Sequence, residues 1–205
     1  MKAPSLPIVV LDIGGVLVDW DPRHLYRKLT PDEEAIEAFL SEVCTMEWNE
    51  EQDAGRPFSE GVKERIARFP AHEAWIRAYQ ERWPEMLAGA FDEAVGIFQR
   101  LLERGPVYAL TNWSAETWPI ARARFPFLDS FAGVLVSGEE GLAKPDPRFY
   151  RLLLERYSLD PAQLLFVDDN RRNVEAARAL GIDAIVHRDA DTLRADLRAR
   201  GLLSD

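Results

Sequence analysis

The sequence predicts an α/β fold, in which a Rossmann-like parallel sheet carries helices on both faces and a helical cap is inserted. Short apolar runs rich in β-branched residues recur along the chain, as is typical of strands buried on both faces. Amphipathic helical patterns alternate with the later runs. Between the first and second runs, roughly two-thirds of a long stretch has helical spacing and no strand signal, which indicates an insertion.

Five segments fit buried strands, and their spacing predicts right-handed parallel crossovers. They are Ile8 to Leu11, Val107 to Leu110, Gly133 to Val136, Leu164 to Val167 and Ala184 to Val186. A helix is expected from about Asp92 to Arg104. Another begins at Asp146, an N-cap followed by a first-turn proline, and a third runs from Arg171 to a stop at Gly181.

The insertion contains the start signals of several helices. The segment Thr30 to Glu33 has the pattern of a capping box and is followed by apolar residues at helical spacing. Ser59 is expected to cap a second helix, and Trp75 to Tyr79 mark a third. The insertion follows the first strand, where ligands bind in open α/β sheets, so we expect it to act as a lid. The expected domains are a catalytic core of residues 1–19 and 89–205 and a helical cap of residues 20–88.

Composition narrows the range of partners. The 205 residues include 25 Lys and Arg against 35 Asp and Glu, a formal net charge of −10 that repels polyanions, so no nucleic-acid partner is expected. No apolar run reaches the length of a signal-peptide core or a membrane span, which predicts a cytoplasmic protein without a membrane partner. Cys44 is the single cysteine, so no intrachain disulfide forms. The expected partner is a small-molecule substrate, and the oligomeric state stays open.

The first two strands end in side chains that suit work on an anion. Asp12 follows the first strand, and the glycines after it allow tight turning. This pattern suits a nucleophile or a metal ligand, although a turn or cap residue has the same pattern. Thr111 and Asn112 follow the second strand with a hydroxyl and an amide, which either hold anionic oxygens or form a turn.

The next two strands are followed by charged residues. Lys144 lies between the third strand and a helix start, where a lysine neutralises a transferred anionic group or is an exposed surface residue. Asp168 and Asp169 follow the fourth strand, and a divalent cation would offset the repulsion between them, although a solvated acidic loop also fits. All of these residues fall at the carboxyl ends of successive strands, the edge at which such a sheet builds its site.

In combination these residues resemble the motifs of the haloacid dehalogenase superfamily, whose members are mostly phosphatases with an aspartate nucleophile. Asp12 with Gly15 matches the first motif, Thr111 the second, Lys144 the third, and Asp168 with Asp169 the fourth. The match in order and strand placement runs from about residue 8 to residue 188. The insertion is similar to the helical cap of one subgroup.

The resemblance implies a covalent mechanism. Asp12 would attack phosphorus and form an aspartyl phosphate, which water then hydrolyses. Mg²⁺ would be held by Asp12, by the backbone carbonyl of Gly14 and by Asp169. Asp168 would be a further ligand or a residue that contacts one. Such hard oxygen ligands suit Mg²⁺.

The resemblance also assigns the residues around the substrate. Thr111 and Asn112 would bind phosphoryl oxygens, and Lys144 would pair with both the nucleophile and the phosphate. A lid that closes over the site would bring its own side chains to the leaving group. The residues expected to contact the substrate are a cap segment from about Glu47 to Gln52, including Trp48 and Asn49, and Trp113 from the core. Trp48 equally fits a position in the core of the cap.

One position departs from the family pattern. Family phosphatases usually carry a second Asp two positions after the nucleophile as general acid and base, and here that position is Gly14. Loss of such help typically costs about 10²- to 10⁴-fold in rate. The pattern is similar to that of bacterial α-glucose-1-phosphate phosphatases, which also have Gly there. We therefore expect a phosphorylated metabolite with a good leaving group, such as a sugar 1-phosphate.

Two other functions fit the same fold. A 2-haloacid dehalogenase would use Asp12 as nucleophile without a metal, and Tyr150, six residues after Lys144, matches its active-site tyrosine. Its fourth motif, however, has serines where this chain has Asp168 and Asp169. A catalytically weak binding protein is the second alternative. Retention of the nucleophile and metal-ligand side chains argues against it.

Overall fold

A five-stranded parallel sheet forms the centre of the computed structural model, which describes residues 6–204. Its order is β5-β4-β1-β6-β7. The strands are β1 (Ile8–Leu11), β4 (Val107–Thr111), β5 (Gly133–Val136), β6 (Leu164–Asp168) and β7 (Asp183–Val186). Each lies within one residue of its predicted range, so the α/β prediction is confirmed. Residues 1–5, which the expected core includes, lie outside the described residues.

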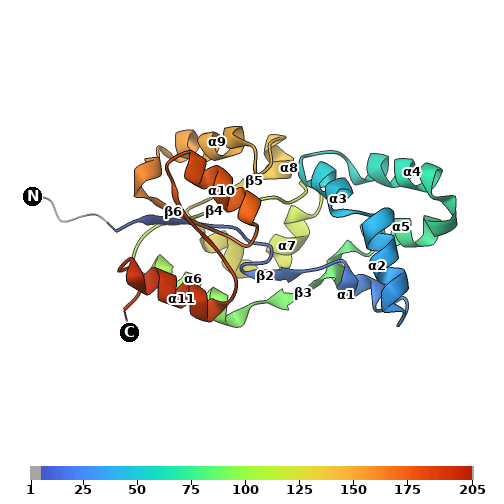
Figure 1. Cartoon of the computed structure of the whole chain (residues 1–205), viewed down its shortest axis with the longest axis horizontal. Coiled ribbons are helices and arrows are strands. Elements are labelled where there is room, and N and C mark those ends of the chain that lie inside the picture. Colours follow the sequence, from blue (N-terminus) through green and yellow to red (C-terminus); the bar gives the residue numbers. More distant parts are fainter. Residues whose placement is uncertain (1–5, 205) are drawn as a thin grey trace, which may run out of the picture.

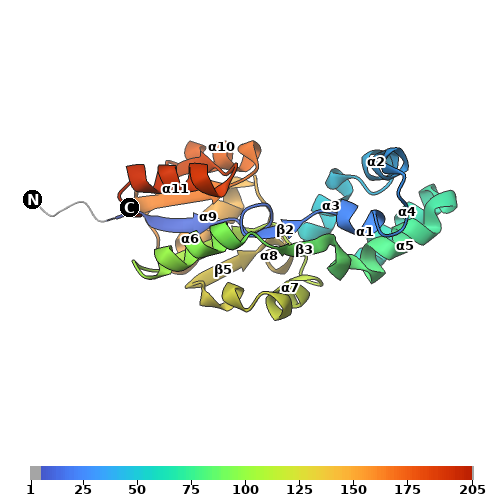
Figure 2. The ribbon, with the colours of Figure 1, turned by 90° about the horizontal axis from the view of Figure 1, so that it is seen from below.

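Helices cover both faces of this sheet (Figures 1 and 2). Val9 and Leu11 of β1 pack in one core, and Val10 packs in the other, because successive residues of a strand point to opposite faces. The first core contains residues of α6 (Asp92–Leu102), α7 (Trp118–Arg124) and α11 (Ala190–Ala199). The second contains residues of α9 (Pro147–Tyr157) and α10 (Arg171–Ala179). Burial on both faces explains why the strands are continuous apolar runs.

Helix starts near the sheet follow their local signals. The Asp146 side chain accepts a hydrogen bond of 2.8 Å from the backbone N–H of Arg148 and caps α9, as predicted. The Asn170 side chain does the same for α10, accepting from Arg172 N at 2.9 Å. Each cap satisfies a backbone donor that the first helical turn leaves free. A short helix, α8 (Ser137–Glu140), follows β5 directly.

The segment between residues 21 and 86 forms a separate group of helices at one end of the molecule (Figure 1). They are α1 (Arg23–Tyr26), α2 (Glu33–Glu42), α3 (Met46–Asp53), α4 (Phe58–Arg68) and α5 (Glu73–Glu81). They share a core rich in aromatic residues, in which Tyr26 and Phe39 have ring centroids 4.9 Å apart. Two predicted caps are wrong. Asp32, not Thr30, caps α2 by accepting from Ala35 N at 3.0 Å, and Ser59 lies inside α4.

A two-stranded antiparallel ribbon joins these helices to the sheet. It pairs β2 (Val18–Trp20) with β3 (Leu87–Ala90), and the sequence analysis did not predict it. The chain leaves the core and returns to it through this ribbon, so both covalent connections of the helical group to the core lie at one place (Figure 2). Among residues 6–204, no helix is both long and apolar enough to cross a membrane.

Candidate active site

The carboxyl ends of β1 and β6 and the segment that follows β5 and α8 bring an ammonium group between two carboxylates. Lys144 Nζ lies 2.9 Å from Asp12 Oδ2 and 2.7 Å from Asp168 Oδ2. All three side chains are buried. The predicted gathering of these residues at one sheet edge is therefore present in the structure. The arrangement suits an anionic reactant, because the lysine lies beside the expected nucleophile.

The group carries more negative charge than the lysine neutralises. Burial raises the pKa of Asp12; Lys144 lowers it, and Asp168 and Asp169 raise it further. Burial and Asp168 likewise raise the pKa of Asp169. For Lys144, burial alone lowers the pKa, but the two adjacent carboxylates outweigh it, so the pKa lies above its usual range. The lysine therefore stays charged, and the site attracts a further cation.

Oxygen atoms in this group are close enough for one ion. Carboxylate oxygens of Asp12, Asp168 and Asp169 lie within 4.8 Å of one another. Three carboxylates offer the hard oxygen donors that Mg²⁺ prefers. The residues present thus fit a magnesium ion.

Asp168 is the most heavily engaged of the three carboxylates. Besides Lys144, it accepts hydrogen bonds from Asn170 N at 2.8 Å and from Asn173 Nδ2 at 3.0 and 3.1 Å. Both of its oxygens are occupied by donors from the protein. Asp168 therefore holds Lys144 in place, which leaves Asp12 and Asp169 as the carboxylates with more freedom to meet an ion.

The turn after β1 requires glycine at one of its two positions. Gly15 has φ of +72°, a conformation that a side chain disfavours, and a Cβ there would lie 2.3 Å from Asp169 Oδ2. Gly14 differs, because the nearest atom to a Cβ would be Trp113 Cζ3 at 3.9 Å. Gly15 thus lets Asp169 approach the end of β1, and Gly14 has room for a Cβ.

Thr111 and Asn112 follow β4 but have different surroundings. The Thr111 hydroxyl is buried and has no hydrogen-bond partner among the described residues, so it is free to donate to an anion. The Asn112 amide is bound to the backbone of Lys144. Its Oδ1 accepts from Lys144 N at 2.8 Å, and its Nδ2 donates to Lys144 O at 2.9 Å. Asn112 therefore positions the lysine.

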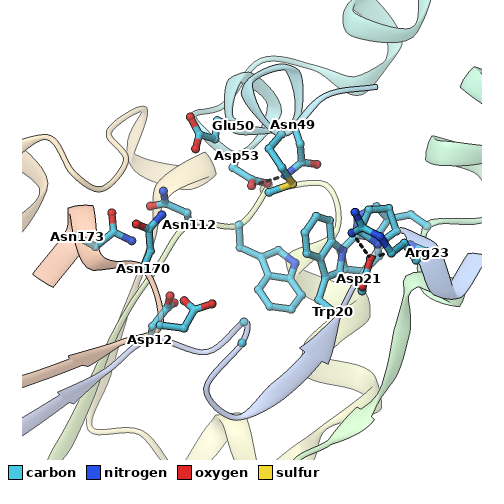
Figure 3. A pocket seen from close by; sticks show the side chains of 17 residues that line it. Asp12, Trp20, Asp21, Arg23, Asn49, Glu50, Asp53, Asn112, Asn170 and Asn173 are labelled. Carbon is cyan, nitrogen blue, oxygen red and sulfur yellow. Dashed lines mark hydrogen bonds and ion pairs between the residues drawn. The ribbon is translucent and has the colours of Figure 1, made fainter. Parts of the chain in front are cut away.

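A cavity of about 360 Å³ is lined by Asp12, Asn112 and Asp169 at the sheet edge and is bounded on the side opposite Asp12 by helix α3 (Figure 3). Of the residues expected to contact the substrate or its phosphate, Asn49, Asn112 and Trp113 line it, whereas Thr111 and Lys144 are buried outside its lining. Trp48 does not line it. Its indole lies in the core of the helical group, 5.0 Å from the Tyr79 ring, and its side chain is 1% exposed.

The sequence analysis missed several residues of this cavity. Trp20 and Trp83 form part of its wall, and Asp53 faces it from α3 beside Glu50, which falls within the expected contact segment (Figure 3). The spacing of polar residues along one face of a helix could have identified the residues of α3. Asn49, Glu50 and Asp53 recur at the spacing of one helix face, which places all three toward the cavity once Asn49 is there.

Asp53 is held in a fixed orientation. Its Oδ2 accepts from Asn49 Nδ2 at 2.7 Å, and Asn49 Oδ1 accepts from the Tyr79 hydroxyl at 2.9 Å. Burial raises the pKa of Asp53 to about 7; a backbone hydrogen bond from Ser114 and that from Asn49 lower it, and Glu50 raises it. The Asp53 backbone carbonyl accepts from the Ser137 hydroxyl, which joins α3 to the core.

Tyr150 has a structural position. Its side chain is 1% exposed, its hydroxyl donates to the Asn173 carbonyl at 2.9 Å, and its ring packs edge-on to Phe166. It does not line the cavity. The match to a dehalogenase tyrosine is therefore not supported by contact with the site.

Comparison with known proteins identifies the family. The sequence profile of the haloacid dehalogenase-like hydrolases matches residues 6–181. The chain belongs to this family of hydrolases. The resemblance seen in the motifs is thereby confirmed, and the cluster around Lys144 is the part of the hydrolase that carries them.

Relatives of this hydrolase include named phosphatases. A phosphorylated carbohydrates phosphatase of Thermotoga maritima is 24% identical over 202 residues, which covers 86% of this chain and 82% of that protein. A phosphoserine phosphatase of Thermus thermophilus is 41% identical over 162 residues, which covers 78% of this chain and 60% of that protein. A HAD family enzyme of Bacteroides thetaiotaomicron, solved with magnesium and inorganic phosphate, superposes with a TM-score of 0.68 at 22% identity, covering 90% of this chain and 95% of that one.

Replacement of Trp48 by Ala should mainly destabilise the hydrolase. The indole is buried against Tyr79 and Phe58, so its loss should lower the free energy of unfolding by about 3–5 kcal/mol. Urea unfolding measures this change. Substrate discrimination should stay within about twofold of the wild type, and a large change in discrimination at unchanged stability would contradict the core position.

Gly15 and Gly14 offer a matched pair of substitutions. Gly15→Ala should lower the free energy of unfolding by about 1–2 kcal/mol because of its positive φ, and should displace the Asp169 carboxylate. Gly14→Ala should change it by less than about 1 kcal/mol. Urea unfolding of both variants checks the difference. Equal losses in the two variants would show that the Gly15 conformation is not the constraint.

Proposed function

We propose that this hydrolase is a Mg²⁺-dependent phosphatase that acts on a small phosphorylated metabolite through an aspartyl phosphate on Asp12. The observation that carries the proposal is the placement of Lys144 beside Asp12, a residue that lines a cavity, with the buried and unpartnered Thr111 hydroxyl at the end of β4, the strand that pairs with β1. Such an arrangement suits a phosphoryl group, which carries negative charge and accepts hydrogen bonds. The phosphatases among the relatives support the same reaction class.

The reaction proceeds in two balanced steps. An oxygen of Asp12 forms a bond to phosphorus while the bond from phosphorus to the leaving oxygen breaks, and that oxygen takes a proton from solvent. Water then attacks phosphorus, releases inorganic phosphate and regenerates the Asp12 carboxylate. Lys144 neutralises charge on the nucleophile and the phosphoryl group, and Thr111 donates a hydrogen bond to a phosphoryl oxygen.

The proposed ligands of the ion are Asp12, the Gly14 carbonyl and Asp169. When bound, Mg²⁺ supplies positive charge that cancels the repulsion between carboxylate and phosphate. Asp168 is assigned to Lys144 and the two asparagines that saturate it. Asn112 is assigned to the backbone of Lys144.

The substrate is proposed to have a good leaving group. Gly14 has no side chain to protonate the departing oxygen, so that oxygen leaves with more negative charge than in a phosphatase with an acid there. An anomeric oxygen, as in a sugar 1-phosphate, stabilises this charge better than an ordinary sugar alcohol does.

Removal of the nucleophile or the ion tests the mechanism. Asp12→Asn should lower kcat by at least about 10³-fold, because an amide oxygen is a poor nucleophile, while thermal unfolding shows that the variant is folded.

Excess chelator should abolish phosphate release, and added Mg²⁺ should restore it. Chloride release from 2-chloropropionate that continues at its full rate in the presence of chelator would instead establish the dehalogenase.

Restoring an acid tests the leaving-group proposal. In the wild type, kcat should fall steeply as the pKa of the leaving alcohol rises, so glucose 1-phosphate should react faster than glucose 6-phosphate. Gly14→Asp should flatten this dependence, because Gly14 has room for a Cβ. Gly14→Asn, which has the same size and no acid, is the control. Equal wild-type rates for the two esters would refute the proposal.

A further inference from the structure

The wall of the cavity opposite Asp12 is the part that meets the leaving group. In a phosphoryl transfer the leaving oxygen departs on the side of phosphorus away from the nucleophile. Asp12 lies at the sheet edge, and Asn49, Glu50 and Asp53 of α3 lie across the cavity from it (Figure 3). These side chains therefore face whatever is attached to the phosphate.

The ionisable groups of this wall are acidic. Glu50 and Asp53 supply carboxyl groups, and Arg23 is the one basic residue that lines the cavity within the described chain. The Arg23 guanidinium is already engaged, at 2.5 Å from Glu37 Oε1 and 3.2 Å from Asp21 Oδ1. Lys144 is buried beneath the cavity between Asp12 and Asp168. The cavity thus offers no unpaired cation to a second anionic group of the substrate.

The acceptors on this wall are arranged in advance. Asn49 fixes one oxygen of Asp53 through its amide and is itself fixed by Tyr79; Asn49 and Tyr79 are 3% and 1% exposed. A side chain fixed in this way binds a hydroxyl with little loss of conformational freedom. A carboxylate group on the ligand would instead meet an acidic wall and be repelled.

Indole rings form the remaining part of the cavity wall. Trp20, Trp83 and Trp113 line the cavity, and the rings of Trp83 and Trp113 are 5.7 Å apart. Indole faces pack against the C–H surface of a saturated ring, and a few oriented polar groups then fix its hydroxyls. The combination suits a hydroxylated ring.

We propose that the leaving group of the substrate is a hydroxylated ring without a second anionic group, and that Glu50 and Asp53 exclude rings that carry one. This inference rests on the proposed phosphatase function and adds the class of the leaving group. It assigns specificity to two residues that lie outside the family motifs of the chain.

The test compares two esters that differ at one carbon. Glucose 1-phosphate and glucuronic acid 1-phosphate have the same ring, but the second carries a carboxylate in place of the C6 hydroxymethyl group. At pH 8, above the pKa of about 7 of Asp53, the wild type should have a kcat/KM at least about 10-fold higher for the uncharged ring, the size expected for like charges several ångströms apart at an effective dielectric constant of about 20. Raising the salt concentration should reduce this ratio, because ions screen the repulsion.

Substitutions assign the effect to the wall. Glu50→Gln with Asp53→Asn removes two carboxyl groups at constant size and should reduce the ratio to below about 3-fold. Glu47→Gln removes a carboxyl group from the same helix, outside the cavity lining, and should leave the ratio unchanged. If the double variant does not fold, Glu50→Gln alone should halve the ratio or more, since Glu50 is exposed.

Two failures are distinguishable. If p-nitrophenyl phosphate and both sugar esters release no phosphate in the presence of Mg²⁺, the proposed function is wrong. If phosphate is released and the wild type hydrolyses both sugar esters with equal kcat/KM, only the inference about the leaving group is overturned. A wild-type ratio that persists unchanged in the folded double variant also overturns it.

Discussion

Lys144 is a positive charge buried at the carboxyl edge of the sheet, between Asp12 and Asp168, and the rest of the site is arranged around it. A buried ammonium without partners would be strongly destabilising, and so would the two carboxylates without the ammonium. The proposed reaction needs the same charge in the same place, beside the nucleophile. One ion-pair cluster therefore serves both the folded state and the chemistry, and Asp168 is devoted to holding it.

The helical group contributes a wall that the core cannot supply. It is joined to the sheet by the β2 and β3 ribbon, and further bonds fix it against the core. The Ser137 hydroxyl donates to the Asp53 carbonyl, and Phe58 N donates to Glu116 Oε1 at 2.9 Å. These contacts place α3 across the cavity from Asp12. The motifs of the sheet edge and the side chains of α3 thus belong to one cavity although they come from distant parts of the chain.

The sheet and its motifs could be predicted because their signals are local. Buried parallel strands are continuous apolar runs, and the residue after each run lies at the site edge whatever the loops do. The ribbon was missed because β2 and β3 are too short to show a periodicity, and their pairing joins segments far apart in the sequence. Asp53 was missed for a related reason: α3 is polar along most of its length, so its inward face is defined only by what packs over it. For Trp48, the sequence left both positions open, and packing against Tyr79 decided between them.

Asn112 acts on Lys144 as a substitute for a peptide group. Its carbonyl accepts from the N–H of Lys144 and its amide donates to the C=O of the same residue, the pattern by which one strand residue pairs with a neighbour. The loop that carries the lysine is thereby attached to the end of β4 as if the sheet were one rung longer. The conformational entropy of this loop is lost once, when the chain folds, and is not lost again in each catalytic cycle.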